Sequence, residues 1–130
     1  MKKMLVALVA AGIGIGLTML ALVANAAVPV STEQTASGSI LVDENRMTLY
    51  TFARDTAMTS NCNGKCAERW IPLEAFEGDQ AEGDYQIFAR SDGAKQWAYK
   101  GKPLYLYDGD ESPGDAKGDG MGGMWKVARP

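Results

Sequence analysis

Short runs rich in β-branched and aromatic residues recur along the chain after residue 38, separated by Gly, Asp, Asn and Lys. Asp92-Gly93 and Lys100-Gly101 supply the positive φ angles that tight hairpin turns need. The segment Cys66–Trp70 is expected to form one helical turn, which ends before Pro72. The pattern predicts a mainly β, antiparallel domain of about seven short strands. These include 39–43, 47–52, 85–90, 95–99, 104–107 and 124–128.

The first 26 residues have the pattern of an export signal. Lys2 and Lys3 precede an uncharged apolar run over 4–23, which ends at the small-x-small sequence Ala24-Asn25-Ala26. We therefore expect a signal peptide over 1–26 that is cleaved after Ala26. The alternative is an uncleaved anchor, because about 20 apolar residues can span a bilayer.

The rest of the chain is expected to comprise a flexible segment over 27–36 and a single β domain over 37–130. No Cys lies near the cleavage point, so no lipid anchor is expected. The released protein would then have no stable membrane anchor, and we expect it to be periplasmic or secreted.

Composition narrows the chemistry. The 130 residues include no His, and the formal charge of −3 becomes −5 once Lys2 and Lys3 leave with the signal. Without His, Ser-His-Asp and Cys-His catalytic pairs and His-ligated haem or zinc are excluded. The acidic balance disfavours a nucleic-acid partner, which requires a basic face. No cofactor is expected, and no residue stands out as a nucleophile or general base.

An internal duplication relates two parts of the chain at an offset of 55 residues. The repeats cover about 37–73 and 91–128, and an acidic connector over 74–84 joins them. Two copies predict one pseudo-symmetric domain rather than a solenoid. The matching pairs are Gly38 with Gly93, Leu49 with Leu104, Tyr50 with Tyr105, Phe52 with Tyr107, Asp55 with Asp110, and Trp70 with Trp125.

The two cysteines, Cys62 and Cys66, fall outside the duplication. In an exported protein such a pair is predicted to form a disulfide, which here would fix a tight loop. One alternative is a soft-metal site, in which two thiolates and the thioethers of Met121 and Met124 bind copper(I). Another is a thiol redox pair.

The duplicated aromatic residues allow two interpretations. In the first, Tyr50, Phe52, Tyr105 and Tyr107 line the core or the seam between the halves, and the following aspartates, Asp55 and Asp110, cap loops by accepting backbone N–H bonds. In the second, aromatic rings line a cleft for a sugar or another planar ligand. The candidate ligand-binding rings are Trp70, Trp97, Tyr99 and Trp125.

The acidic loop over 108–119 also suggests a weak divalent-cation site, because clustered carboxylates suit hard cations. The loop fails the register of an EF-hand, since Pro113 stands where Gly is required. A solvated surface loop is the simpler interpretation.

Several motifs together resemble a bacterial family of predicted lipoproteins, or secreted-repeat proteins, that carry a Yx(F/W/Y)xxD motif. The motif occurs here twice, at 50–55 and 105–110, with C-x-G-x-C-A-x-x-W-x-P at 62–72, D-G-x-x-Q-W at 92–97 and G-x-P-L-Y at 101–105. The resemblance implies a two-repeat β domain and an envelope or secreted location, and it supplies no catalytic residues. Two departures are the missing lipobox cysteine and Ile71 in place of the usual Pro.

Two hypotheses about function follow. The first is a non-enzymatic binding or interaction module of the cell envelope, with an unknown ligand. The alternative is a sulfur-ligand copper protein or a thiol redox protein. An enzyme acting on envelope polymers would need a carboxylate of raised pKa in a cleft. The candidates are Asp55, Asp110 and Glu68, and the sequence favours none of them over the others.

Overall fold

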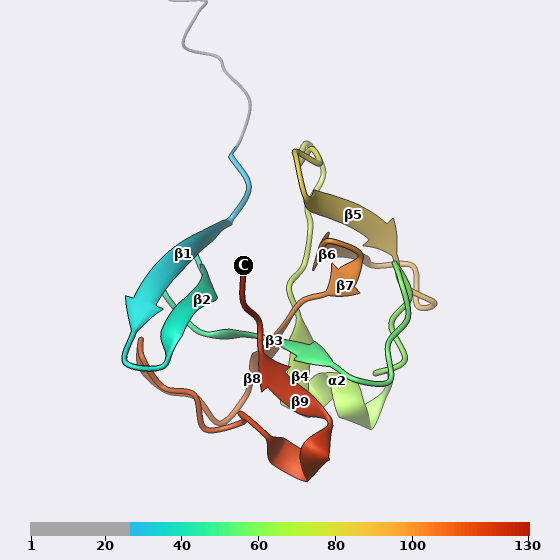
Figure 1. Cartoon of the computed structure of the whole chain (residues 1–130). Coiled ribbons are helices and arrows are strands. Elements are labelled where there is room, and N and C mark those ends of the chain that lie inside the picture. Colours follow the sequence, from blue (N-terminus) through green and yellow to red (C-terminus); the bar gives the residue numbers. More distant parts are fainter. Residues whose placement is uncertain (1–26) are drawn as a thin grey trace, which may run out of the picture.

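The computed structural model describes residues 27–130, in which a central sheet carries two hairpin wings (Figure 1). The predicted signal peptide, 1–26, lies outside the described residues. Within 27–130, neither helical segment has the length and hydropathy of a membrane span. The elements are β1 (Val30–Thr35), β2 (Gly38–Asp43), β3 (Leu49–Phe52), α2 (Lys65–Arg69), β4 (Trp70–Pro72), β5 (Tyr85–Ala89), β6 (Lys95–Tyr99), β7 (Lys102–Pro103), β8 (Tyr105–Tyr107), η2 (Met121–Gly123) and β9 (Trp125–Val127).

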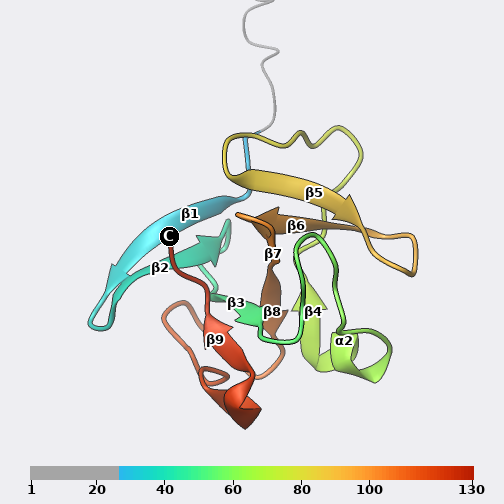
Figure 2. The ribbon, with the colours of Figure 1, turned by 45° about the vertical axis from the view of Figure 1, so that its right-hand side comes forward.

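The central sheet interleaves the two repeats. Its strand order is β4-β8-β3-β9, and every neighbouring pair is antiparallel (Figure 2). β3 and β4 come from the first repeat, whereas β8 and β9 come from the second. Tyr50 pairs with its own counterpart Tyr105 at the centre of the sheet. A pseudo-twofold axis therefore passes between β3 and β8.

The outer pairs of the sheet obey the same symmetry. Phe52 faces Trp125 across β3 and β9, and the counterparts Tyr107 and Trp70 face each other across β8 and β4. Because β8 separates β3 from β4, neither repeat alone can satisfy the backbone groups of its own strands. The fold requires both repeats at once.

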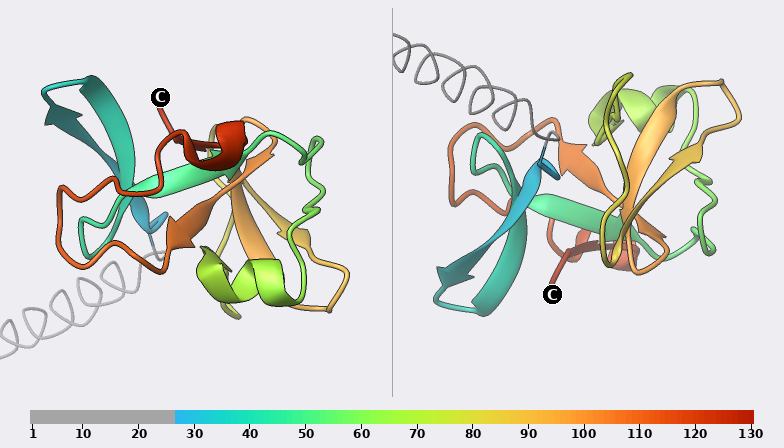
Figure 3. Two further views of the ribbon diagram at one scale, coloured as in Figure 1. Left: turned by 90° about the horizontal axis from the view of Figure 1, so that it is seen from below. Right: turned by 90° about the horizontal axis from the view of Figure 1, so that it is seen from above.

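Each repeat also contributes one wing. β1 and β2 form one antiparallel hairpin, while β5, β6 and β7 form a three-stranded sheet. The hairpin turn joins Thr35 to Gly38 in the first wing and Ala89 to Lys95 in the second, so the second turn is longer. The two helical segments, α2 and η2, lie on either side of β3 (Figure 3).

Strand alternation divides the core into two clusters, one on each face of the central sheet. Tyr50 and Tyr105 belong to one cluster, whereas the preceding residues Leu49 and Leu104 belong to the other. Trp97, fully buried, fills the second cluster together with Leu41. Successive residues of a strand point to opposite faces, so both faces of β3 and β8 are apolar.

A stack of four aromatic rings lies on the pseudo-twofold axis. Trp70 and Trp125, counterparts in the two repeats, stack in parallel with ring centroids 3.8 Å apart and an interplanar angle of 2°. Phe52 covers the outer face of Trp125 at 4.2 Å, and Tyr107 covers Trp70 at 4.4 Å. The edges of these rings meet Tyr50 and Tyr105 at 5.1 Å. Aromatic burial thus joins all four strands of the central sheet.

The predicted mainly β, antiparallel, two-repeat architecture is confirmed, including the helical turn and all six strand segments, within one or two residues for most of their ends. The expected flexible segment 27–36 instead contains β1, which pairs along its whole length with β2. Its residues are mostly polar and exposed, so they carry no hydrophobic signal. β4 and β7 are also additional, and both contain a proline that an edge position tolerates.

We predict that Trp70→Leu and Trp125→Leu each lower the free energy of unfolding by about 2–4 kcal/mol, because each leaves a cavity in the ring stack. The double variant should lose about 0.5–1.5 kcal/mol less than the two single losses combined, since the first change already removes the stacking. Urea unfolding measures all four proteins, with Phe76→Leu as an exposed aromatic control. Simple additivity would show that the two rings are not coupled.

Candidate functional site

The two repeat motifs bind each other through reciprocal hydrogen bonds. Tyr50 donates its hydroxyl hydrogen to Asp110 Oδ2 at 2.7 Å, and Tyr105 donates to Asp55 Oδ2 at 2.6 Å. Both tyrosines are fully buried. The first residue of each motif therefore reaches the last residue of the other, across the pseudo-twofold axis.

The second oxygen of each aspartate caps the loop that follows its strand. Asp55 Oδ1 accepts the Asn61 N–H at 2.7 Å, and Asp110 Oδ1 accepts the Lys117 N–H at 2.9 Å. Burial raises the pKa of Asp55 above its ordinary value, although the bonds from Tyr105 and Asn61 partly offset this effect. With both oxygens engaged by donors, these carboxylates hold the scaffold and are not poised to take a proton from a substrate.

Most rings that a ligand cleft would need are inside the protein. Trp97 has no exposed surface, and Trp70 and Trp125 are each only 6% exposed. Of the four candidate ligand-binding rings, Tyr99 alone is partly exposed, where it packs against Tyr85 at 4.9 Å. The structure thus places the duplicated rings in the core, and no aromatic cleft opens at the seam between the described repeats.

The cysteine loop is closed by a disulfide between Cys62 and Cys66, as predicted. Cys62 is fully buried in the cluster that contains the ring stack. Met121 is the counterpart of Cys66 and lies in η2, on the other side of β3 from α2 (Figure 3). The four sulfur ligands proposed for copper(I) are therefore split between two symmetry-related places, and two of them are bonded to each other.

Arg90 is the buried residue that sequence reasoning missed. Its guanidinium, in a side chain 2% exposed, donates to Ser60 Oγ at 2.9 Å, to Gln96 Oε1 at 2.7 Å and to the Cys62 carbonyl at 2.7 Å. Ser60 in turn bonds Tyr105 at 2.7 Å. Arg90 comes from the second repeat and the cysteine loop from the first, so this residue fastens the unduplicated loop to the opposite wing. The signal available in the sequence was an Arg at the end of an apolar strand.

Carboxylates of the acidic loop accept hydrogen bonds from backbone N–H groups of the loop and of β9. Asp115 accepts the N–H groups of Glu111 and Ser112, and Asp119 accepts the Val127 N–H. Among residues 27–130, no group of three or more cysteines, aspartates and glutamates is arranged to hold a metal ion. The loop is a self-capped surface segment.

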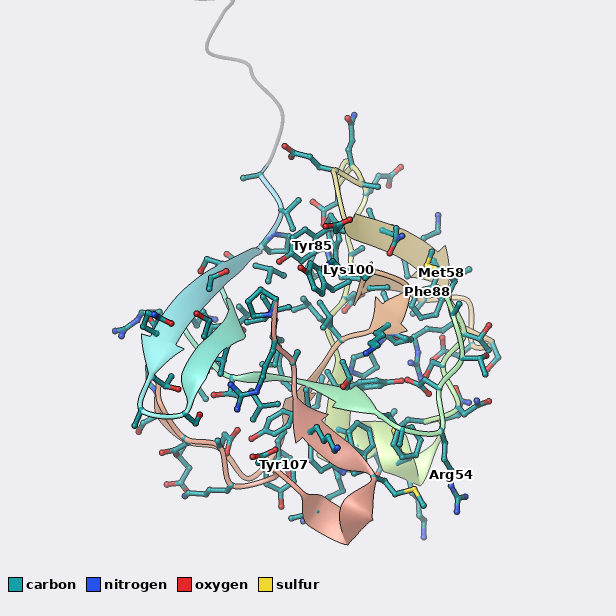
Figure 4. All side chains as sticks on the ribbon, viewed as in Figure 1. Arg54, Met58, Tyr85, Phe88, Lys100 and Tyr107 are labelled. Atoms are coloured by element: carbon teal, nitrogen blue, oxygen red, sulfur yellow. A yellow bond between two sulfur atoms is a disulfide. The ribbon has the colours of Figure 1, made fainter. Side chains whose placement is uncertain are left out.

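A surface groove runs beside β9 and the β6–β7 turn. Two adjoining hollows of about 650 and 470 Å³ share four lining residues, Thr51, Lys100, Lys102 and Lys126. Tyr99 and Arg129 line the first hollow. In Figure 4, Lys100 and Tyr107 lie on opposite sides of β3. The second hollow nevertheless reaches the ring stack, because Phe52 lines it and stacks on Trp125. We call the two hollows together the β9 groove.

The cationic side chains of the β9 groove are exposed. Lys100, Lys102 and Lys126 have no Asp or Glu within 4.0 Å among the described residues. Arg129 is held by the first wing, because its Nη1 donates to the Ser37 carbonyl at 3.0 Å. Within 27–130, the groove thus combines one anchored guanidinium with three ammonium groups that have no carboxylate partner, of which that of Lys100 lies over the Tyr99 ring at 5.2 Å.

We predict that the protein loses stability as the pH rises above about 10, the ordinary pKa of tyrosine. Burial and the bonds to Asp110 and Asp55 raise the pKa values of Tyr50 and Tyr105 well above this value. Their stabilising effect is therefore complete below pH 10 and is lost as the pH approaches the raised values, because only the unfolded chain ionises there. Tyr50→Phe and Tyr105→Phe should both flatten this pH dependence in chemical unfolding curves. An unchanged slope in both variants would contradict this account.

We predict that the intact mass of the exported protein shows two hydrogens fewer than the reduced chain, and that alkylating reagents leave it unchanged. The Cys62→Ser/Cys66→Ser variant should lose about 2 kcal/mol of stability, the loop-entropy contribution of so short a ring. Arg90 would still bind the Cys62 carbonyl, which the substitution leaves in place. Full alkylation without reduction would show that the thiols are free.

A comparison with known families matches two segments, residues 31–74 and 86–129, to one model described as a secreted repeat of unknown function. The matched segments are themselves 55 residues apart, as the sequence offset predicts, and each starts earlier than the repeats inferred from the motifs. Neither the curated proteins nor the solved structures contain a match to this chain. The two matched segments cover most of the sequence, and the chain therefore belongs to the family of secreted repeats of unknown function.

Proposed function

We propose that this protein is a non-enzymatic binding module of the bacterial cell envelope, periplasmic or secreted, and that the β9 groove is its binding surface. Membership of a secreted family supports an exported location. The envelope location, the binding role and the binding surface go beyond that family membership.

The observation that carries the proposal is the contrast between the motif residues and the groove residues. The motif tyrosines and aspartates form hydrogen bonds with each other, and the aspartates also accept loop N–H groups. The lysines of the β9 groove are instead exposed and make no salt bridge within residues 27–130, and Lys100 Nζ lies 5.2 Å from the centroid of the Tyr99 ring. Side chains that are free and concentrated in a concave surface are the ones available to a ligand.

The floor of the groove is held by a rigid scaffold, which favours binding. Interleaved strands and the ring stack hold the floor of the groove, which includes Thr51 of β3 and Lys126 of β9, paired in register. Such a floor needs little ordering when a ligand binds, which lowers the entropic cost. The sulfur-based alternative has less support, because Cys62 and Cys66 are already bonded to each other.

Blocking the groove tests the proposal. Thr51→Phe inserts an uncharged ring into the shared floor of both hollows. Its matched control is Leu106→Phe. Leu106 is the counterpart of Thr51 at the offset of 55, and it pairs with Ile71 of β4, the edge strand on the other side of the central sheet. We expect wild-type protein and the Leu106 variant to sediment with envelope fragments of the source bacterium, and the Thr51 variant to bind about tenfold more weakly.

Circular dichroism and urea unfolding should first establish that both variants are folded. Absence of wild-type binding to the envelope fragments, or equal binding by both variants, would overturn the proposal that the groove is the binding surface.

A further inference from the structure

Resting on the proposed function, we infer that the β9 groove binds an extended polymer, other than a nucleic acid, that carries repeated phosphate or carboxylate groups. The inference names the chemical class of the ligand for that surface. It comes from the charge of the groove, from its symmetry-related twin in the first repeat and from its elongated form.

The charge of the groove is opposite to that of the chain. The whole sequence carries a formal charge of −3, yet Lys100, Lys102, Lys126 and Arg129 all line the groove. Two carboxylates also line it, but both are engaged: Asp119 accepts the Val127 N–H, and Asp55 bonds Tyr105 and Asn61. The side chains that line the groove therefore include four basic and two acidic ones, and a concave surface with a net charge of one sign concentrates ligands of the other sign.

The first repeat contains the same groove with a different lining. A hollow of about 530 Å³ lies beside β4, the counterpart of β9, and contains no basic residue. Its lining includes Asp43, Glu44, Glu74 and Asp79, together with the exposed Ile71 and Phe76. Since backbone and fold are shared, the basic lining is not a requirement of the repeat. At the offset of 55, the four basic residues correspond as follows: Lys100 to Asn45, Lys102 to Met47, Lys126 to Ile71, and Arg129 to Glu74.

Lys100 has a backbone conformation that is unfavourable for a residue other than glycine. Its φ of 49° and that of Gly101, 81°, place both residues in the left-handed region, as a tight hairpin turn requires. Asn is the usual non-glycine residue in that conformation. The turn of the first repeat differs, because Asn45, the counterpart of Lys100, has no positive φ and the next residue, Arg46, has a φ of 65°. A lysine there is unfavourable for the turn itself, but it places an ammonium group at the junction shared by both hollows.

The form of the groove favours a chain over a compact anion. All four basic residues line the first hollow, and Lys100, Lys102 and Lys126 also line the second, so the positive lining continues from one hollow into the next. Ammonium groups on flexible stems act as separate point charges, which suits anionic groups repeated along a polymer.

The lysines provide a matched pair of variants. Of the six lysines beyond residue 26, three line the groove and three, Lys65, Lys95 and Lys117, do not. The groove variant is Lys100→Asn/Lys102→Gln/Lys126→Gln. The control variant is Lys65→Gln/Lys95→Gln/Lys117→Gln, which changes the net charge by the same amount. A difference between the two variants therefore reports the site and not the overall charge.

Binding should be measured with long-chain inorganic polyphosphate and with polygalacturonate, at several salt concentrations, with dextran as the uncharged comparison. We expect wild type and the control variant to bind at least one polyanion, with affinity falling as salt rises. The groove variant should bind it about tenfold or more weakly and with a shallower salt dependence. The preferred polyanion identifies the anionic group as phosphate or carboxylate.

Equal losses in the two variants, or no binding of either polyanion by wild type, would overturn the inference. Binding of duplex DNA as tight as that of the preferred polyanion would also overturn it, since the groove would then be a nucleic-acid site. Measuring envelope binding by the same variants distinguishes failure of the polyanion inference from failure of the proposed function. If envelope binding is lost in Thr51→Phe but kept in the groove variant, the groove is the binding surface and its ligand is uncharged.

Discussion

Stacking of Trp70 on Trp125 across the pseudo-twofold axis is the contact around which the rest of the molecule is arranged. The two rings come from opposite edges of the central sheet, on β4 and β9, and they meet above its two inner strands. This is possible only because the repeats are interleaved. Each edge strand pairs with a strand of the other repeat, and each outer ring of the stack lies on that same partner strand. Hydrogen bonding and aromatic burial therefore enforce the same arrangement.

The repeat motif is explained by this arrangement. Its tyrosine supplies a ring edge to the stack and a hydroxyl to the opposite aspartate, and the aspartate closes the following loop. A buried phenol without an acceptor would be costly, so Tyr and Asp must be present in both repeats. The most recognisable residues of the chain thus serve the scaffold. The repeats differ instead in the lining of the edge grooves and in the cysteine loop.

Arg90 and the disulfide show how the symmetry is broken without loss of the core. The loop between Cys62 and Cys66 exists in one repeat only, and a buried guanidinium from the other repeat satisfies its carbonyl groups. Removing a charged partner from such a site leaves buried acceptors unsatisfied, which costs more than the bonds contribute. The wing formed by β1 and β2 has no such arginine, because the counterpart of Arg90 at the offset of 55 is Thr35 of β1. One wing is therefore fastened to the cysteine loop, and the other is held by Arg129.

The sequence by itself determined the β class, the turns and the offset of 55, because periodicity and turn chemistry are local signals. It predicted a disulfide between Cys62 and Cys66 but left a copper(I) site and a thiol redox pair as alternatives, and the structure contains the disulfide. The sequence left β1 unrecognised, since an exposed polar strand carries no apolar pattern, although the offset relates Val30 to Tyr85 of β5. It also left two interpretations of the aromatic residues open. Only the tertiary structure decided between them, because burial of Trp70, Trp97 and Trp125 depends on which strands become neighbours. The basic groove has the same origin. Lys100 and Lys102 are distant in the sequence from Lys126 and Arg129, and the two pairs share one surface only once β9 pairs with β3 of the other repeat.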